Sequence, residues 1–150
     1  MKHYAAATFK ARQSIGYLLK RAHGLLMERA EAAFENHDLN FTQWVILLRL
    51  RDGLGNTAAE LCRGVGHDSG ALTRVLDQLE QRGLIGRSRS KQDRRVVELS
   101  LTKRGHSMLE SLIPLTVEKL NEAVDDFSAA EFREFLRLLN KLIGTLEPGK

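Results

Sequence analysis

Cysteine is almost absent from this chain of 150 residues, in which Cys62 stands alone. One cysteine cannot form a disulfide within the chain, and this is typical of a reducing compartment, so we expect a cytoplasmic protein. No run of about 18 apolar residues occurs, and we expect no membrane-spanning helix. The N-terminal residues have no apolar segment behind them, so no secretory signal is expected either.

Motifs of enzymes and of metal or cofactor sites are also missing. The five histidines and the cysteine lack the spacings of structural zinc sites, so no metal is expected. There is no glycine-rich phosphate loop and no local Ser/His/Asp motif. We therefore expect a protein that is not an enzyme and that needs no cofactor.

Charges of the two signs are separated along the chain, although the net charge is only +4. Residues 82–104 hold eight lysines and arginines against two acidic residues, whereas residues 121–147 hold three basic residues against six acidic ones. A local basic block indicates an anionic partner, and the acidic end must serve a different purpose.

Hydrophobic periodicity predicts four helices in the first half of the chain. The third is short, with Asn56 or Thr57 as its cap and Gly64 as its stop, and Gly83 terminates the fourth. The expected ranges are about 9–34, 41–51, 58–63 and, after a lead-in at 66–68, up to about 82.

After the fourth helix the apolar period changes from 3.6 to 2, as in a half-buried strand. Residues 84–89 and 95–101 are therefore expected to pair as a β-hairpin across a polar turn at 90–94.

Two further helices are expected after the hairpin. Thr102 caps a long fifth helix, and Ser128 opens a sixth with a capping box. Pro114 lies well inside the fifth helix, where a proline removes one backbone hydrogen bond. Either two helices meet there, or one kinked helix passes from one lobe to another.

The third and fourth helices form a helix-turn-helix pattern, which many helical proteins share. Opposite its apolar stripe, the fourth helix carries small side chains and one long cation, Arg74, which suits close approach to a DNA groove. A merely solvated face is the alternative. The basic hairpin that follows favours DNA, because a cationic β-wing can reach the neighbouring minor groove.

Two stretches, DSGALTRVLDQLEQRGLI at 68–85 and DRR at 93–95 followed by VELSLTKRG at 97–105, resemble motifs of the MarR family of bacterial regulators. The first is similar to the family's recognition helix and wing entrance. The second is similar to its Asp-x-Arg wing tip, closing strand and Leu-Thr-x-x-Gly helix start. The resemblance covers almost the whole chain.

The resemblance implies a mainly α fold: a winged helix-turn-helix with a two-stranded β-wing and an N- and C-terminal helical dimerisation lobe. It implies one domain over residues 1–150, with 36–104 as the DNA-binding lobe and 1–35 with 105–150 as the dimerisation lobe. The implied function is that of a homodimeric repressor, which binds double-stranded DNA at a palindromic operator and is released by a small phenolic or aromatic ligand.

The resemblance also assigns DNA contacts to residues of the fourth helix. Thr73 and Arg74 are expected to contact base edges, with Ser69 and Gly70 near the DNA backbone. These positions begin the helix that would enter the major groove.

In the wing, the resemblance places Arg95 in the minor groove, oriented by Asp93 through a charge-assisted hydrogen bond. A turn-forming aspartate is the alternative for Asp93. Phosphate contacts are expected from four further residues, Arg87, Arg89, Lys91 and Arg94.

The family typically binds its effector in a cleft between the two lobes. Aromatic walls with a cation suit an aromatic acid, so the candidate lining residues are Tyr17, Arg21, His23 and Trp44, each of which could instead be core or interface. Three rival functions are a non-specific architectural DNA-binding protein, a redox-responsive regulator using Cys62, and a helical protein-interaction module. A buried, inert thiol is the simpler interpretation of Cys62.

Overall fold

The computed structural model describes residues 3–34, 36–66 and 69–147. It is mainly helical, with a two-stranded antiparallel sheet and two short 3-10 turns, Ala6–Thr8 and Ala11–Gln13, ahead of the first helix. The other elements are α1 (Ile15–Phe34), α2 (Phe41–Arg51), α3 (Ala58–Val65), α4 (Ser69–Gln81), β1 (Ile85–Arg89), β2 (Val97–Leu101), α5 (Lys103–Ala123) and α6 (Ala129–Leu146).

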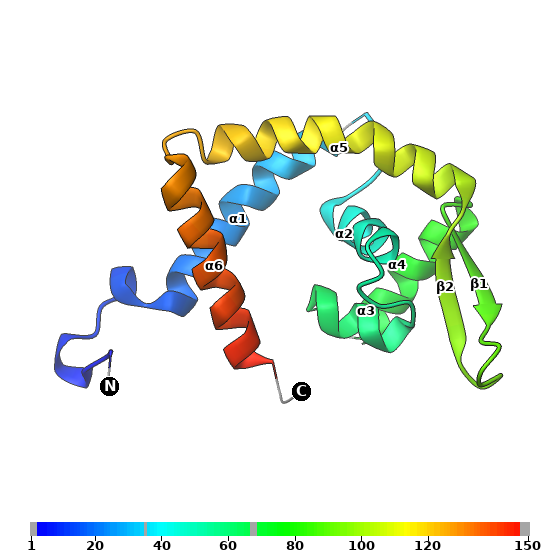
Figure 1. Cartoon of the computed structure of the whole chain (residues 1–150), viewed down its shortest axis with the longest axis horizontal. Helices are drawn as coiled ribbons and strands as arrows, with labels where there is room; N and C mark the ends of the chain where they lie inside the picture. Colours follow the sequence, from blue (N-terminus) through cyan, green and yellow to red (C-terminus); the bar gives the residue numbers. More distant parts are fainter. Residues whose placement is uncertain (1–2, 35, 67–68, 148–150) are drawn as a thin grey trace.

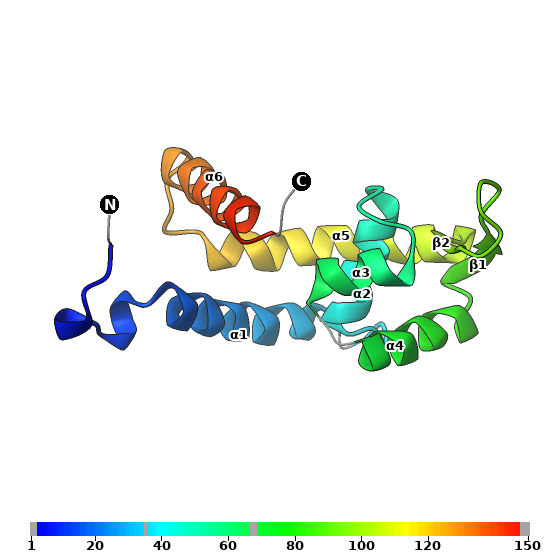
Figure 2. The same cartoon turned by 90° about the horizontal axis from the view of Figure 1, so that it is seen from below.

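The elements divide into two lobes that share α5 (Figure 1). Helices α2, α3 and α4 gather with the β1–β2 hairpin at one end of α5, and we call this group the winged lobe. Helices α1 and α6 lie along the other end, and with that half of α5 they form the helical lobe. Figure 2 shows α6 on the opposite side of α5 from α1. The mainly α, winged helix-turn-helix fold expected from the sequence is confirmed.

An aliphatic core holds the winged lobe together. Each helix of the lobe, the hairpin and the first half of α5 contribute fully buried side chains, among them Ile46, Leu47, Leu61, Leu72, Leu76, Leu79, Leu84, Ile85, Leu109 and Leu112. Burying one such side chain contributes about 1.5–3 kcal/mol. The exposed faces of α4 and of the hairpin therefore stand on a rigid base.

Two expected helix boundaries are wrong. The first helix begins at Ile15, not near residue 9, because the segment before it forms 3-10 turns in which Phe9 packs against Tyr4, ring centroids 5.5 Å apart. The third helix passes through Gly64 and ends at Val65, and Gly66 closes it with a left-handed φ of 68°. The predicted lead-in at residues 67 and 68 lies outside the described part of the chain.

Helix α5 is continuous from Lys103 to Ala123 with Pro114 inside it. Before the proline, Leu109 and Leu112 are buried in the winged lobe, whereas beyond it Leu120 is 41% exposed in the helical lobe. Of the two interpretations of Pro114, the structure supports one helix that passes from lobe to lobe.

Helix α6 has no buried residue within the protomer. Its apolar stripe is exposed, as Leu138 (49%) and Ile143 (52%) illustrate. The apolar side of α1 is similarly open, with Ile15, Leu18 and Leu25 exposed. No described helix combines the length and the apolar character that crossing a membrane would require.

Candidate nucleic-acid interface

The outer face of α4 presents the residues that the sequence assigns to base contacts. Leu72, Leu76 and Leu79 fix the helix against the core, and this turns Thr73 and Arg74 outward, where both are exposed. The Thr73 hydroxyl donates to the backbone carbonyl oxygen of Ser69, 2.8 Å away, so it has a fixed rotamer. Ser69, Gly70, Thr73 and Arg74 thus share the start of one helix and lie within its first two turns.

The turn that precedes α3 is held by a second set of bonds. Thr57 accepts from the backbone N–H of Glu60 in a capping box, and the Glu60 carboxylate accepts from the backbone N–H of Asn56 and of Thr57, each at 3.0 Å. These hydrogen bonds, that from Asn56 foremost, lower the pKa of Glu60 from its ordinary value. The carbonyl oxygen of Asn56 in turn accepts from the backbone N–H of Leu99, 2.7 Å away, which joins the hairpin to this turn.

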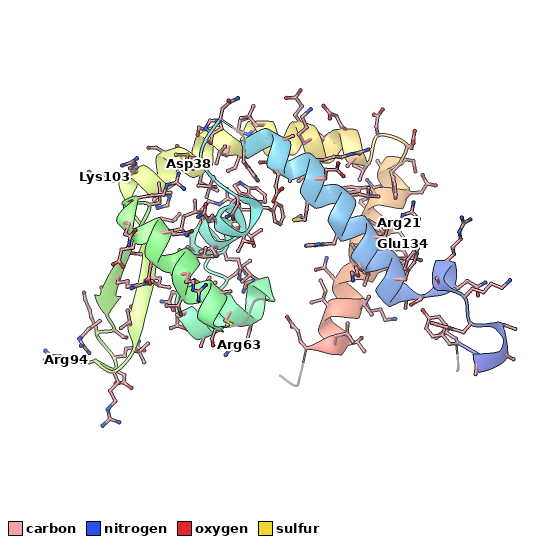
Figure 3. All side chains as sticks on the ribbon, turned by 180° about the vertical axis from the view of Figure 1, so that it is seen from behind. Arg21, Asp38, Arg63, Arg94, Lys103 and Glu134 are labelled. Carbon is pink, nitrogen blue, oxygen red and sulfur yellow. The ribbon has the colours of Figure 1, made fainter. Side chains whose placement is uncertain are left out.

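The hairpin pairs in a simple antiparallel register, from Ile85 opposite Leu101 to Arg89 opposite Val97. The residues between the strands close the tip: the backbone N–H of Ser90 donates to the carbonyl oxygen of Val96 at 2.9 Å. Arg94 lies at the outer end of the hairpin, at the edge of the lobe farthest from α5 (Figure 3). Arg63 of α3 lies along that same edge, which is therefore cationic.

The wing cations fall into two groups. Arg87 forms ion pairs with carboxylates of α4, and Arg89 donates from Nη1 to the carbonyl oxygen of Arg94 at 2.7 Å. Over residues 69–147, in contrast, the exposed side chains of Lys91, Arg94 and Arg95 make no hydrogen bond or ion pair within the chain. The guanidinium groups of Arg87 and Arg89 thus have partners within the chain, and a phosphate contact would use their remaining N–H donors.

Asp93 bonds to the backbone and not to a guanidinium. Its Oδ1 accepts from the backbone N–H of Arg95 at 2.9 Å, and its carbonyl oxygen accepts from the N–H of Val96 at 2.9 Å. In this structure the aspartate therefore shapes the turn, as in the alternative interpretation of Asp93, and orients Arg95 only through its backbone.

The four candidate effector residues do not form one cluster. Tyr17 and Arg21 are exposed neighbours on α1, 3.5 Å apart between OH and Nη1. His23 points elsewhere and lines a hollow of about 670 Å³ between α1, α2 and the end of α3, with Met27 and Val45 among its walls. Trp44 is only 8% exposed and packs in the core, and it does not line the hollow beside His23.

Several neighbours of the site are not predicted from the sequence. Asp77 and Glu80, which hold Arg87, carry a usable sequence signal, because acidic residues three apart on a helix share a face. Gln43 caps α2 together with Asn40 and also donates to the side-chain oxygen of Gln78 on α4, at 3.1 Å. The capping box Asn40-x-x-Gln43 is visible in the sequence, whereas the contact with α4 depends on the fold.

Cys62 is half-buried beside the core of the winged lobe. In the part of the chain that is described, no group of three histidine, cysteine, aspartate or glutamate residues is placed to hold a metal ion.

Comparison with known proteins connects these features to one family. The family model described as the MarR family matches residues 39–97, which span α2, α3, α4, β1 and the first residue of β2. The HTH-type transcriptional repressor NicR of Pseudomonas putida is 29% identical over 139 residues, which cover 90% of this chain and 85% of the relative.

Two solved structures resemble the whole architecture. BpsR of Bordetella bronchiseptica, described with a mechanism for regulation of its DNA binding by 6-hydroxynicotinic acid, is 25% identical with a TM-score of 0.75, over 85% of this chain and 97% of that one. A mutant of MarR of Escherichia coli complexed with operator DNA is 26% identical, also with a TM-score of 0.75, over 85% of this chain and 92% of that one. The similarity therefore includes the helical lobe as well as the wing.

Proposed function

The chain belongs to the MarR family of transcriptional repressors, and we propose that it acts as a homodimer that binds a palindromic operator and is released by an aromatic acid. One observation carries the DNA-binding part. Thr73 and Arg74 at the start of α4 and the uncommitted cations at the tip of the hairpin are exposed elements of one rigid lobe. A helix and a cationic wing in this relation match a major groove and the minor groove beside it.

Dimerisation is supported by the helical lobe. A protomer leaves the apolar stripes of α1 and α6 uncovered, and α6 in particular buries nothing of its own. A second copy would cover both stripes and would place two winged lobes side by side. Two-fold symmetry then requires an inverted repeat, with half-sites about one helical turn, or about 34 Å, apart.

The effector part rests on the hollow beside His23. Its walls combine apolar side chains, Met27, Phe41 and Val45, with the imidazole of His23 and the carboxylate of Glu31. The apolar walls suit a flat ring, and His23 is a lining side chain that can donate to a carboxylate on that ring. The regulation of BpsR by 6-hydroxynicotinic acid supports this ligand class. A bound ring would contact α1 and α2 together, and so would link the dimer helices to the winged lobe.

Selection of genomic fragments by the purified dimer tests the DNA-binding proposal. We expect recovered fragments to share an inverted repeat and to bind about a thousandfold or more tightly than random DNA at equal ionic strength. A non-specific architectural protein would bind both alike, and a protein-interaction module would bind neither. Cys62→Ser tests the redox alternative, because a redox-responsive regulator would lose its response to peroxide.

The effector proposal has a separate test. Calorimetry with 6-hydroxynicotinic acid should show binding and release of the operator, whereas the uncharged amide of the same ring should bind at least about tenfold more weakly. His23→Ala should lose the preference for the acid. Equal binding of acid and amide to the wild type would contradict a site built for a carboxylate.

A further inference from the structure

One guanidinium of the wing is held by two carboxylates of α4. Arg87, in the middle of β1, places Nη2 2.6 Å from Oδ1 of Asp77 and Nη1 3.1 Å from Oε2 of Glu80. Asp77 and Glu80 lie three residues apart and therefore face the hairpin from the same side of α4. In the described part of the chain, no other ion pair joins the hairpin to a helix.

Stability does not explain this arrangement. The three side chains are between 34% and 46% exposed, and ion pairs as exposed as these contribute little to the free energy of folding. The carboxylates also stand at an unfavourable place for DNA affinity, because Asp77 is less than one turn from Arg74 and repels phosphates. Their contribution must be sought in geometry.

A rotation of the hairpin at Arg87 also displaces the tip of the wing. The tip begins after Arg89, two residues beyond Arg87, or about 7 Å of extended chain at about 3.3 Å per residue. A rotation of about 15° at Arg87 would therefore move the start of the tip by roughly 2 Å, and the cations farther out by more, which exceeds the range of about 0.5 Å over which hydrogen-bond lengths vary. The hairpin is anchored by buried Ile85 and, on β2, by buried Leu99, whose backbone N–H donates to the carbonyl oxygen of Asn56; among the described residues, the ion pairs of Arg87 are the polar contacts that join β1 to α4.

We propose that Asp77 and Glu80 are positioning residues, which act through Arg87 to set the angle between the wing and α4 so that both engage the same half-site. The inference rests on the DNA-binding function proposed above. In this arrangement the two carboxylates lower the affinity for any duplex and raise the discrimination in favour of the operator. Arg87 then links β1 to α4 through its two ion pairs and does not contact phosphate.

The double variant Asp77→Asn/Glu80→Gln removes both ion pairs of Arg87 without changing side-chain size, and leaves its guanidinium only neutral amide acceptors. In the absence of DNA, we expect the amides of β1 and β2 to exchange at least about fivefold faster than in the wild type, with α5 unchanged. If the hairpin amides exchanged as slowly as in the wild type, the ion pairs of Arg87 would not restrain the hairpin, whatever the protein binds.

DNA binding supplies the second measurement. Two negative charges are removed, so the affinity for random DNA should stay equal or rise, while the ratio of operator to random affinity should fall about tenfold or more. An unchanged ratio would overturn the positioning role. If the wild-type protein preferred no DNA sequence, the proposed function would be refuted. The exchange experiment would still decide whether the ion pairs of Arg87 restrain the hairpin.

Coupling to the wing tip separates positioning from a general structural defect. In an Arg95→Ala background, the double variant should cost no further discrimination, because the carboxylates act through the contact already removed. Fully additive losses would contradict the proposal. Glu134→Gln is the matched control: it breaks a comparable pair with Arg137, Nη2 to Oε1 at 2.7 Å, on α6 and should leave the ratio unchanged.

Discussion

Gly105 of α5 lies directly against the backbone carbonyl oxygen of Leu84, at the point where the wing leaves the fourth helix. A Cβ at position 105 would overlap that oxygen. The same oxygen accepts from the backbone N–H of Thr102, 3.1 Å away, and the Thr102 hydroxyl donates to the carbonyl oxygen of Gly83 at 2.6 Å. The start of α5 and the entrance to the wing are therefore one closely packed junction.

Gly105→Ala should consequently lower the free energy of unfolding by about 2–3 kcal/mol, because backbone at both sides of the contact has to move. Urea denaturation measures this change. Gly83→Ala is the comparison: no atom obstructs a Cβ there, and its φ of 67° alone should cost about 1 kcal/mol. Equal losses for the two variants would show that the contact with Leu84 is not tight.

Asp93→Asn should bind the operator within about twofold of the wild type, whereas Asp93→Ala should lose affinity. An asparagine oxygen can still accept from the N–H of Arg95 and hold the turn, but an alanine cannot. Equilibrium binding of the two variants decides between the two roles of the aspartate. If both variants lost affinity equally, the negative charge and not the turn would matter.

Arg74→Ala should cost about 1–3 kcal/mol at the operator and should relax base preference at one position in each half-site. The guanidinium is exposed on the outer face of α4, and a guanidinium that enters the major groove can make a bidentate contact with guanine. Binding to a panel of single-base operator variants measures the preference. A uniform loss over the whole panel would mean that Arg74 contacts phosphate.

Ile143→Asp should convert the dimer to monomers at micromolar concentration, because a buried, unpaired charge would replace an apolar contact between protomers. Light scattering gives the mass. Leu54→Asp is the control, since Leu54 is equally exposed (54%) but lies in the winged lobe. A wild-type protein with the mass of a monomer would refute the dimer altogether.

Glu60→Gln should destabilise the protein most at neutral pH. The pKa of Glu60 is lowered in the folded state, so its stabilising effect is complete above its unfolded pKa, about 4.3, and disappears as the pH falls through the folded pKa. The difference in urea midpoint from the wild type should thus narrow below about pH 4. Glu110→Gln, on an exposed face of α5, should show a small difference at every pH.

The sequence predicts those features that depend on a few neighbouring residues. Ser128 caps α6 as expected, and apolar alternation predicts the second strand, although that strand begins at Val97 and not at residue 95. The predicted end of α3 at Gly64 is wrong because Gly64 and Gly66 both follow Leu61 closely. Only the tertiary structure decides that Gly66 takes the left-handed φ. The guanidinium of Arg49 lies where a Cβ on Gly64 would be, so Gly64 leaves room for that side chain within the helix and does not terminate it.

The residues of the candidate site likewise include some that the sequence predicts and others whose roles depend on the fold. Periodicity alone predicts that Thr73 and Arg74 face outward, since the buried stripe of α4 fixes the opposite face. The roles of the wing arginines depend on side chains that approach from elsewhere in the chain. Arg87 and Lys91 look alike in the sequence, but only Arg87 comes within reach of the carboxylates of α4.

The hydrogen bond from Thr73 to Ser69 also has a consequence for base recognition. While the hydroxyl proton is engaged by the carbonyl oxygen, Oγ1 meets a base edge with lone pairs only. It can then accept from the amino group of adenine or cytosine but cannot donate to guanine or to the oxygen of thymine. Arg74, which only donates, has the opposite polarity. Adjacent positions of α4 thus offer the major groove complementary halves of its donor and acceptor code.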